Sequence, residues 1–374
     1  MLLKSLFNKA SEALENKLPF VLYNLPNSQE IKGLFLKDDT LRYALNFEEQ
    51  GFVFSPFDDI EKTILFSSTT AETVSTKTTS DELVLLKELE IQTLINPSET
   101  TISNHINLVS KGIQEIQKTD LQKVVLSRSI EMDTEKSALE IFKTLLLKYS
   151  DAFAYIWHHP KVGTWLGATP ETLLAVNGNR FKTMALAGTQ AYNGMLDVEW
   201  QQKEREEQQI VTNSIKEALE SESRQLTISQ AETSKAGQLL HLKSMISGNF
   251  KFSFNLKNVL IKLHPTPAIC GFPKALAKEF ISKNEKYSRE YYTGFLGELN
   301  LSTEELRSAK TQNLEHSAYR RQRGTTNLFV NLRCLKLLKN EAVIYVGGGI
   351  TKDSNPEAEF WETHKKSQTM LSVI

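Results

Sequence analysis

The sequence has little that would cross-link the chain or anchor it in a membrane. Cys270 and Cys334 are its only cysteines among 374 residues, which argues against a disulfide framework and suits a reducing compartment. The stretch from Met1 to Phe20 includes Glu12 and Glu15 and lacks a continuous apolar core, so it does not resemble a secretion signal. No apolar run is long enough to span a bilayer. We expect a cytoplasmic protein with no membrane partner.

The chain also lacks an excess of either charge. It carries 44 Lys and Arg against 45 Asp and Glu, for a net charge of −1. No dense basic cluster is present, so we expect no nucleic-acid partner. With 40% hydrophobic and 24% charged residues, the composition is that of a folded chain with ample core material. A small molecule is the expected partner, and a monomer is the default expectation because no feature indicates an oligomer.

The first third of the chain offers elements but no chemical motif. A helical pattern covers Leu6 to Leu14, a strand-like run covers Phe20 to Tyr23, and a Ser/Thr-rich passage from Ser67 to Ser80 is predicted as a loop. From Lys123 onward, short strand-like runs rich in β-branched residues alternate irregularly with helical segments. These runs are Lys123–Ser127, Val259–Leu263, Leu328–Leu332 and Ala342–Val346. Because strands and helices are not in strict βαβ order, we predict an α+β fold of antiparallel sheets flanked by helices.

The strand-like run that begins at Lys123 contains a candidate base. A period of two places Lys123, Val125 and Ser127 on one face. A lysine that shares a face with valine is a candidate for burial, which lowers its pKa and suits it to act as a general base. The alternative is a lysine at a strand end that extends into water.

A second candidate group follows a proline. In Gly167-Ala-Thr-Pro-Glu171, the glutamate stands between a flexible glycine and an apolar Leu-Leu pair. A carboxyl group in apolar surroundings stays protonated to higher pH and can act as an acid. Alternatively, Thr169-Pro-Glu begins a turn or a helix whose N-terminus favours Glu171.

Two acidic helices are candidates for cation binding. On the predicted helix from Asp197 to Ser221, Glu207 lies on the inner face with Trp200 and Val211, whereas its charged neighbours fit a solvated surface. A later helix starts near Pro356, and its residues Glu359, Glu362 and Lys366 recur on one face. Glutamate oxygens suit Mg²⁺. The alternative for Glu362 and Lys366 is a surface ion pair.

Two further runs suit the wall of a binding site. Val346-Gly-Gly-Gly-Ile350 leaves a predicted strand, and its glycines permit backbone amides to converge on a carboxylate. His264-Pro-Thr-Pro-Ala-Ile-Cys270 follows a predicted apolar strand, and its two prolines stiffen the backbone. A lone histidine is more often structural than catalytic, and no His/Cys spacing indicates zinc.

Taken in order, these runs resemble the chorismate-binding family, which comprises anthranilate synthase large subunits and aminodeoxychorismate, isochorismate and salicylate synthases. The matching stretches are Lys123-Val-Val-Leu-Ser-Arg, Gly167-Ala-Thr-Pro-Glu, Ala187-Gly-Thr, His264-Pro-Thr-Pro-Ala-Ile-Cys-Gly, Arg289-Glu-Tyr-Tyr-Thr-Gly, Val330-Asn-Leu-Arg-Cys, and Gly347-Gly-Gly-Ile through Glu362-Thr-His-Lys-Lys366. The resemblance implies a four-layer α/β sandwich with two facing, mainly antiparallel sheets and outer helices. It divides the chain into a variable N-terminal part of the same fold, residues 1–115, and a catalytic region, residues 116–374.

The resemblance also assigns roles to single residues. Lys123 would activate water, Glu171 would protonate the departing hydroxyl, and His264 would lie close to the reacting ring. Glu207, Glu359 and Glu362 would bind Mg²⁺. The substrate, chorismate, would be bound by Ala187, Gly188, Thr189, Tyr292, Arg333, Gly347, Gly348, Gly349 and Lys366.

Two positions select an activity within the family. Lys123 is present where ammonia-using enzymes usually lack it, and Ala187 stands where aminodeoxychorismate synthases carry a nucleophilic lysine. Both indicate water as the nucleophile, so the resemblance implies an isochorismate synthase without a glutaminase subunit. Its product would feed menaquinone or siderophore synthesis. The alternatives are a salicylate synthase, which also eliminates pyruvate, and a silent relative that only binds.

Overall fold

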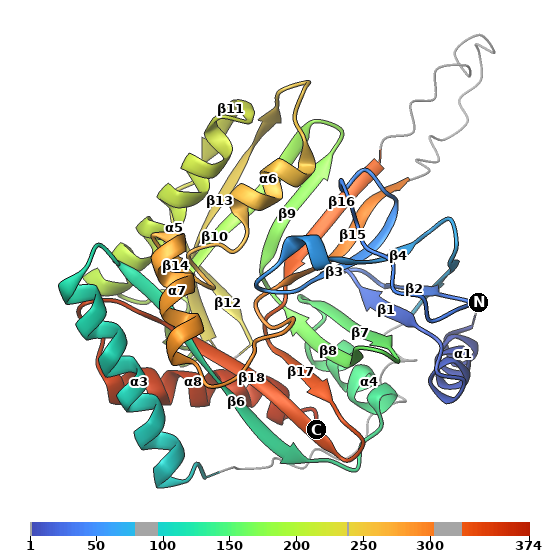
Figure 1. Ribbon diagram of the computed structural model, residues 1–374, viewed down its shortest axis with the longest axis horizontal. Coiled ribbons are helices and arrows are strands. Elements are labelled where there is room, and N and C mark those ends of the chain that lie inside the picture. Colours follow the sequence, from blue (N-terminus) through green and yellow to red (C-terminus); the bar gives the residue numbers. More distant parts are fainter. Residues whose placement is uncertain (1, 79–95, 238, 303–323) are drawn as a thin grey trace.

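Two antiparallel sheets form the centre of the protein. The computed structural model describes residues 2–78, 96–237, 239–302 and 324–374, and Figure 1 shows the arrangement of these parts. The first sheet has the strand order β14 (Gly271–Phe272), β6 (Lys123–Asp133), β18 (Glu341–Ile350), β17 (Cys334–Leu337), β8 (Gly163–Thr169), β7 (Phe153–His159), β1 (Phe20–Asn24), β2 (Glu30–Phe35) and β5 (Glu72–Lys77).

The second sheet is built in the same way. Its order is β11 (Ser223–Ile228), β13 (Leu239–Phe250), β10 (Arg180–Ala191), β9 (Thr172–Asn177), β16 (Gly324–Val330), β15 (Phe295–Ser302), β3 (Gly51–Ser55) and β4 (Ile64–Ser67), with β12 (Glu232–Ala236) also paired to β13. The first 77 residues therefore supply strands to both sheets. The division of the chain at residue 115 stays a prediction.

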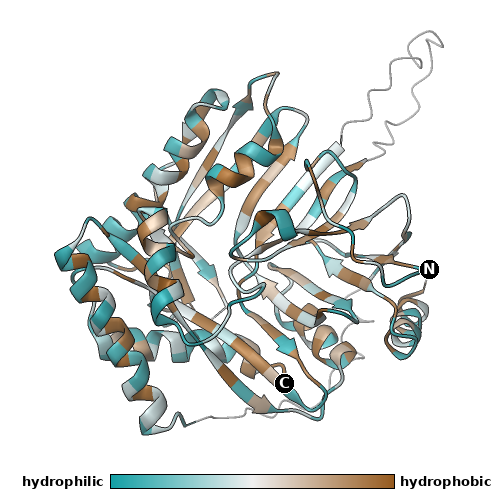
Figure 2. Cartoon of the chain, in the orientation of Figure 1, coloured by the Kyte–Doolittle hydropathy of each residue, from teal (hydrophilic) through white to brown (hydrophobic). Residues whose placement is uncertain are grey.

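An aromatic core joins the two sheets. Trp157 and Trp165 of the first sheet pack with Phe54 of the second, at ring-centre distances of 4.9 Å and 6.0 Å from Phe54. Phe153 and Phe329 stack across the same interface at 4.3 Å. Figure 2 shows the hydrophobic residues concentrated along the strands. Large buried rings supply much of the apolar area that holds the sheets together.

Helices cover the outer faces of both sheets. The first sheet is covered by α1 (Leu3–Glu15), α4 (Ala138–Lys148) and the C-terminal end of α8 (Pro356–Leu371). The second is covered by α5 (Gln202–Glu220) and α6 (Leu256–Leu263), while α3 (Glu99–Lys118) and α7 (Lys274–Asn284) pack against β6. The predicted four-layer fold with outer helices is thus confirmed.

The start of α8 also agrees with the sequence. The Asn355 side chain accepts a hydrogen bond from the Ala358 amide, and Pro356 occupies the first turn. This cap fixes the helix so that Glu359 and Glu362 fall one turn apart on the side facing the first sheet.

Two local predictions were wrong. The run Val259–Leu263 is part of helix α6, which begins where the Asn255 side chain caps the Asn258 amide. Five apolar residues alone cannot distinguish a buried strand from a buried helix. The Ser/Thr-rich passage contains strand β5, in which Glu72–Lys77 pair with β2 and threonine suits the pleated edge. Residues 79–80 of that passage lie outside the described residues.

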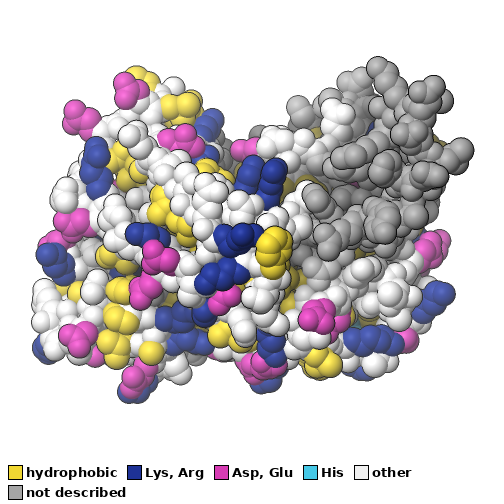
Figure 3. Space-filling view, turned by 90° about the horizontal axis from the view of Figure 1, so that it is seen from above, with side chains coloured by type: hydrophobic (Ala, Val, Ile, Leu, Met, Phe, Trp, Pro, Cys, Tyr) yellow, Lys and Arg dark blue, Asp and Glu magenta, His cyan; other side chains and the backbone are white. Residues whose placement is uncertain are grey.

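The surface carries charges of both signs. On the face drawn in Figure 3, Lys and Arg side chains are interspersed with Asp and Glu. Within the described part of the chain, no helix is long and apolar enough to cross a membrane. Cys270 and Cys334 are buried free thiols. A monomeric, cytoplasmic protein without a nucleic-acid partner stays a prediction.

Candidate active site

Lys123 and Glu207 form a buried pair between the first sheet and helix α5. Lys123 begins β6 and its side chain is fully buried, while its Nζ lies 2.9 Å from Glu207 Oε1. The approach is too poorly directed for a hydrogen bond, so the buried Nζ has no hydrogen-bond partner. The alternative of a lysine extending into water is therefore excluded. A buried amine with a free hydrogen-bonding position is placed to exchange a proton with a molecule bound next to it.

The glycines of the Gly-Gly-Gly run make room for this pair. Gly347, Gly348 and Gly349 lie within β18 and pair with Ser127, Leu126 and Val125 of β6. The prediction that they leave the strand was wrong, because pairing with β6 continues to Ile350. A Cβ atom on Gly349 would lie 2.4 Å from Glu207 Oε1 and 2.9 Å from Lys123 Cε. The absence of a side chain at Gly349 is thus needed for Lys123 and Glu207 to meet.

Glu171 lies in the short connection between β8 and β9 and is buried. Burial raises the pKa of Glu171 to about 8, although the nearby positive charges of Lys123, Arg333 and Lys366 act in the opposite direction. A carboxyl group with this pKa is mostly protonated near neutral pH, as an acid must be. The structure therefore brings three of the predicted cationic groups close to the predicted acid. Glu171 begins no helix.

Two further carboxylates project from α8. Lys203 Nζ on α5 donates a hydrogen bond to Glu359 Oε1, and Lys366 Nζ lies 2.7 Å from Glu362 Oε1. Burial raises the pKa of Glu359, and the Glu362 carboxylate raises it further. Burial also acts to raise the pKa of Glu362, but Lys366 and the other nearby cations prevail and lower it. The expectation of a solvated surface was wrong for Lys203, which reaches across to α8.

The donor set fits a hard divalent cation in its chemistry. Glu359 Oε2 is buried without a hydrogen-bond partner. It would lie 3.5 Å from a Cβ atom on Gly348, and Glu362 Oε1 would lie 3.7 Å from the same point, so the two oxygens face one small region. Within the described ranges, no three His, Cys, Asp or Glu residues are already grouped as a metal site. Glu207, Glu359 and Glu362 are each paired with a lysine, so a cation would have to compete with these pairs.

Arg333 and Tyr292 lie close enough to act on each other's pKa, and Arg333 also acts on that of Glu171. Arg333 joins β16 to β17 with a φ of 48°, and burial lowers its pKa while Tyr292 and Glu362 act to raise it. Tyr292 is buried, and its hydroxyl would lie 3.0 Å from a Cβ atom on Gly347. Lys366 Nζ donates to the Gly347 carbonyl at 3.1 Å. These groups form a cationic, hydrogen-bonding wall suited to a carboxylate.

The Ala187-Gly188-Thr189 segment forms a bulge in β10. Ala187 pairs with Leu242 and Thr189 pairs with His241, so Gly188 is the extra residue. Gly188 has a φ of 76°, and a Cβ atom there would lie 3.0 Å from Glu204 Cβ. Glycine therefore permits both this backbone conformation and the close approach of the first turn of α5. This helix carries Lys203 and Glu207.

The structure adds a histidine that sequence reasoning missed. His241 Nδ1 lies 3.0 Å from the Gly188 carbonyl oxygen. Burial lowers the pKa of His241 to about 3, with smaller contributions from Arg333 and Lys366, so this ring is neutral and close to the cationic wall. A signal was available, because a histidine among the apolar residues of Leu239–Phe250 stands on a strand-like run. Pairing with the Ala187-Gly188-Thr189 strand was not visible in the sequence.

His264 lies in different surroundings. It follows helix α6, its ring lies 5.0 Å from the ring of Phe295, and neither ring nitrogen has a hydrogen-bond partner. Burial lowers the pKa of His264 to about 3, with help from Lys274 and Lys278. None of its described contacts is with Lys123 or Glu171, so a role next to the reacting ring stays a prediction.

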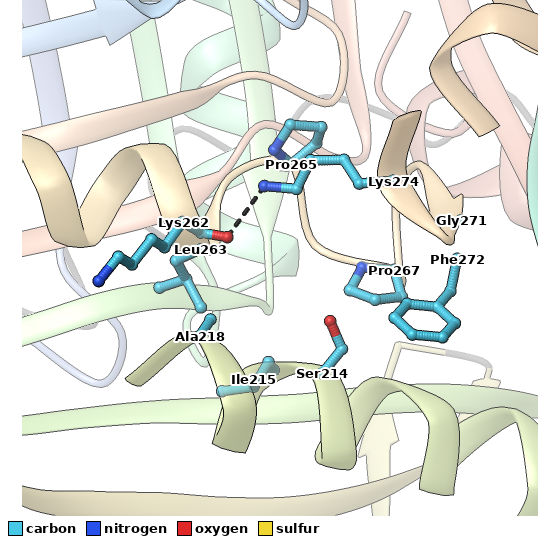
Figure 4. A pocket seen from close by; sticks show the side chains of 10 residues that line it. All are labelled: Ser214, Ile215, Ala218, Lys262, Leu263, Pro265, Pro267, Gly271, Phe272 and Lys274. Atoms are coloured by element: carbon cyan, nitrogen blue, oxygen red, sulfur yellow. Dashed lines mark hydrogen bonds between the residues drawn. The ribbon is translucent and has the colours of Figure 1, made fainter. Parts of the chain in front are cut away.

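Two hollows in the described part of the molecule lie away from these groups. A cavity of about 60 Å³ lies between α5 and the α6–α7 connection, where Lys274 Nζ donates to the Lys262 carbonyl (Figure 4). A larger, open hollow of about 650 Å³ lies at the far end of the second sheet, near Phe252 and Asn300. Neither is lined by Lys123 or Glu171. The first cavity is too small for a ring substrate. We therefore place the candidate active site where the charged side chains of Lys123, Glu171 and Arg333 converge.

Comparison with known proteins agrees with this assignment. A family model described as "Chorismate binding enzyme" matches residues 52–374. The isochorismate synthase EntC of Escherichia coli K12 is 30% identical over 292 residues, which is 74% of this chain and 68% of that protein.

Two solved structures share the fold. The putative 2,3-dihydroxybenzoate-specific isochorismate synthase DhbC of Bacillus anthracis has a TM-score of 0.73 and 21% identity over 97% of this chain and 99% of that chain. The menaquinone-specific isochorismate synthase MenF of Escherichia coli has a TM-score of 0.74 and 19% identity over 95% and 88% of the two chains. At these identities the structures support the architecture alone.

Proposed function

Because the chain belongs to the chorismate-binding enzyme family, we propose that it is an isochorismate synthase that converts chorismate to isochorismate by adding water and releasing a ring hydroxyl. The observation that carries this proposal is the joint burial of Lys123 and Glu171. Glu171 has a pKa of about 8 and senses the charge of Lys123. One group can thus take a proton and the other can give one within the same enclosed region.

Lys123 is the proposed base. Its side chain is fully buried and makes one ion pair, with Glu207. Loss of its proton to solvent would leave a neutral amine, which can accept a proton from water as that water attacks the ring. Because Lys123 is buried and stands on a paired strand, its side chain has few other orientations.

Glu171 is the proposed acid. It holds a proton near neutral pH because its carboxyl group is desolvated. It would donate this proton to the leaving hydroxyl, which departs as water. Acid and base assistance of this kind each contribute about 10²- to 10⁴-fold in rate.

The cationic wall is the proposed carboxylate site. Arg333 offers a planar guanidinium, and the Lys366 ammonium lies near the Gly347 carbonyl. Arginine suits a carboxylate because its two N–H groups match the two oxygens. Glu207, Glu359 and Glu362 would hold Mg²⁺, which when bound would neutralise carboxylate charge on the substrate.

The small residue at position 187 favours water as the nucleophile. Ala187 is buried beside the Gly188 bulge, and an alanine side chain cannot form a covalent bond to the ring. An enzyme that uses water requires no ammonia and therefore no glutaminase partner.

The test is incubation of the purified protein with chorismate, with and without Mg²⁺, followed by chromatography and a parallel pyruvate assay. We expect isochorismate without pyruvate, and only in the presence of Mg²⁺. Salicylate with stoichiometric pyruvate would assign the protein to the lyase branch instead. Absence of turnover at any metal concentration would contradict both assignments. A variant at an exposed position of α5, Lys216→Met, should give the same product as the wild type and serves as the control for later substitutions.

A further inference from the structure

Lys203 has a placement that its sequence context does not explain. It stands in the first turn of α5, where the helix dipole disfavours a cation. Its ammonium nevertheless reaches the carboxylate of Glu359 on α8. The Glu359 side chain is only 2% exposed. The contact therefore joins two helices that carry the proposed cation ligands, and an interaction with Glu359 must outweigh the unfavourable end of α5.

The ammonium of Lys203 is close to the three proposed metal ligands. It bonds to Glu359, and the negative charges of Glu362 and Glu207 act on it as well. Glu204, on the same first turn, has a buried oxygen without a hydrogen-bond partner. The region is thus rich in carboxylates, and Lys203 is a monovalent cation located among them.

Charge balance is a second feature of the site. Three carboxylates are matched by three ammonium groups, in the pairs Lys123–Glu207, Lys203–Glu359 and Lys366–Glu362. A divalent cation added to these three pairs would bring two further positive charges, which a low-dielectric site disfavours. Departure of one ammonium would reduce the excess to one, and a carboxylate of the substrate would remove the rest.

The three lysines differ in their freedom to leave. The Lys123 side chain is 0% exposed and that of Lys366 is 13% exposed, whereas that of Lys203 is 26% exposed. Lys203 lies near the beginning of its helix, so its long side chain can rotate into solvent without disturbing the sheet. Of the three ion pairs, Lys203–Glu359 is therefore the one whose separation requires the least reorganisation.

We propose that Lys203 is a displaceable counter-cation, which neutralises Glu359 in the metal-free protein and is expelled when Mg²⁺ binds. Lys203 then acts as a positioning residue for the metal ligands and not as a group that contacts the reacting ring. Because the expulsion leaves one positive charge, Mg²⁺ and an anionic substrate should each strengthen the binding of the other. This inference rests on the Mg²⁺ site of the proposed function.

The experiment is a calorimetric titration of Mg²⁺ into substrate-free protein. We compare the wild type with Lys203→Met, Lys203→Gln, Lys203→Arg and the control Lys216→Met. Both neutral variants should bind Mg²⁺ about tenfold or more tightly, because a buried carboxylate then lacks its competing cation. Lys203→Arg and Lys216→Met should bind it as the wild type does. The Gln variant can still donate a hydrogen bond to Glu359, so it guards against misfolding of the Met variant.

Thermal unfolding provides a second readout. Without metal the neutral variants should melt below the wild type, and Mg²⁺ should raise their midpoint by more than it raises that of the wild type. Equal loss of stability with and without Mg²⁺ would show a merely structural ion pair and overturn the inference. Lost turnover with an unchanged Mg²⁺ affinity would overturn it too, in favour of direct contact with substrate.

The titration is independent of the product formed. If the wild type binds Mg²⁺ and the neutral variants bind it more tightly, the inference holds even where the product is not isochorismate. If neither the wild type nor the variants bind Mg²⁺, the proposed metal site and the role of Lys203 are both wrong.

Discussion

Two buried clusters of charge contact β6, and they differ in how completely their atoms are bonded. In the first, Arg289 and Glu285 are each 2% exposed. Arg289 donates to both oxygens of Glu285 at 2.6 Å and 2.8 Å and to the Val125 carbonyl at 2.7 Å. Glu285 also accepts from the Ser127 amide and hydroxyl, both at 2.8 Å.

The second cluster is the candidate active site, where burial is similar but bonding is incomplete. Lys123 Nζ and Glu359 Oε2 have no hydrogen-bond partner, and Glu171 holds a proton because no cation fully compensates its burial. Unsatisfied buried groups cost stability. The Arg289–Glu285 cluster is bonded to the β6 backbone and holds that strand in place, whereas the incompletely bonded cluster has groups free for the proposed substrate and cation.

The largest effect is expected at Lys123. Replacement by Met should lower kcat by about 10²- to 10⁴-fold because the base is lost. The free energy of unfolding should change little, since the ammonium makes only one poorly directed pair. Chromatographic assay of isochorismate and urea unfolding measure the two quantities. Retained turnover would remove Lys123 from the role of base.

The opposite pattern is expected at Arg289. Arg289→Met should lower the free energy of unfolding by about 3 to 5 kcal/mol, because it leaves Glu285 buried and unpaired. Any loss of activity should follow the fraction of folded protein. Urea unfolding with activity measured on the folded fraction tests this. If Arg289→Met stayed as stable as the wild type, the division into a structural and a functional cluster would fail.

Glu171 should make both stability and turnover depend on pH. Its folded pKa is about 8 against an ordinary value of 4.5, so between these pH values the folded protein holds a proton that the unfolded chain has released. The free energy of unfolding should therefore fall as pH rises through this range, by an amount on the order of a few kcal/mol. In Glu171→Gln this decline should be absent when unfolding is measured from pH 5 to pH 9.

The same group should limit turnover at high pH. As the acid loses its proton above about pH 8, kcat of the wild type should fall. A profile of kcat that stays flat to pH 10 would exclude Glu171 as the acid.

The smallest effect is expected from adding one methyl group. In Gly349→Ala the new Cβ would meet Glu207 and Lys123 at 2.4 Å and 2.9 Å, whereas in Gly348→Ala the contacts are 3.5 Å or longer. We expect Gly349→Ala to lower kcat/KM by about tenfold or more, since the crowding corresponds to about 1 to 3 kcal/mol of strain. Gly348→Ala should lower it less. Equal losses would show that the crowding of Lys123 does not matter.

Much of the site was predictable from local sequence. The run from Lys123 indicated a partly buried strand, and Thr169-Pro-Glu171 indicated a constrained carboxyl group. Pro356 indicated the helix start that places Glu359 and Glu362 on one face. Each prediction follows from a short-range rule: the period of a strand, the restricted backbone at proline, or the preference for proline in the first turn of a helix. The family resemblance placed these runs in one fold, which the chain adopts.

Other features were decided by contacts between distant segments. Short apolar runs such as Val259–Leu263 carry no unique period, so burial against α5 and the second sheet selected a helix. His241 reached the site only because β13 pairs with β10 at the Gly188 bulge.

Side-chain chemistry and helix or strand period are local properties, so the sequence and its family resemblance indicated candidate acids, bases and ligands before any contact was known. Only the tertiary structure decided their partners, above all the pairing of Lys123 with Glu207 and of Lys203 with Glu359. The physical reason is that burial and Coulomb interactions, which set pKa and binding, depend on distances between atoms far apart in the chain.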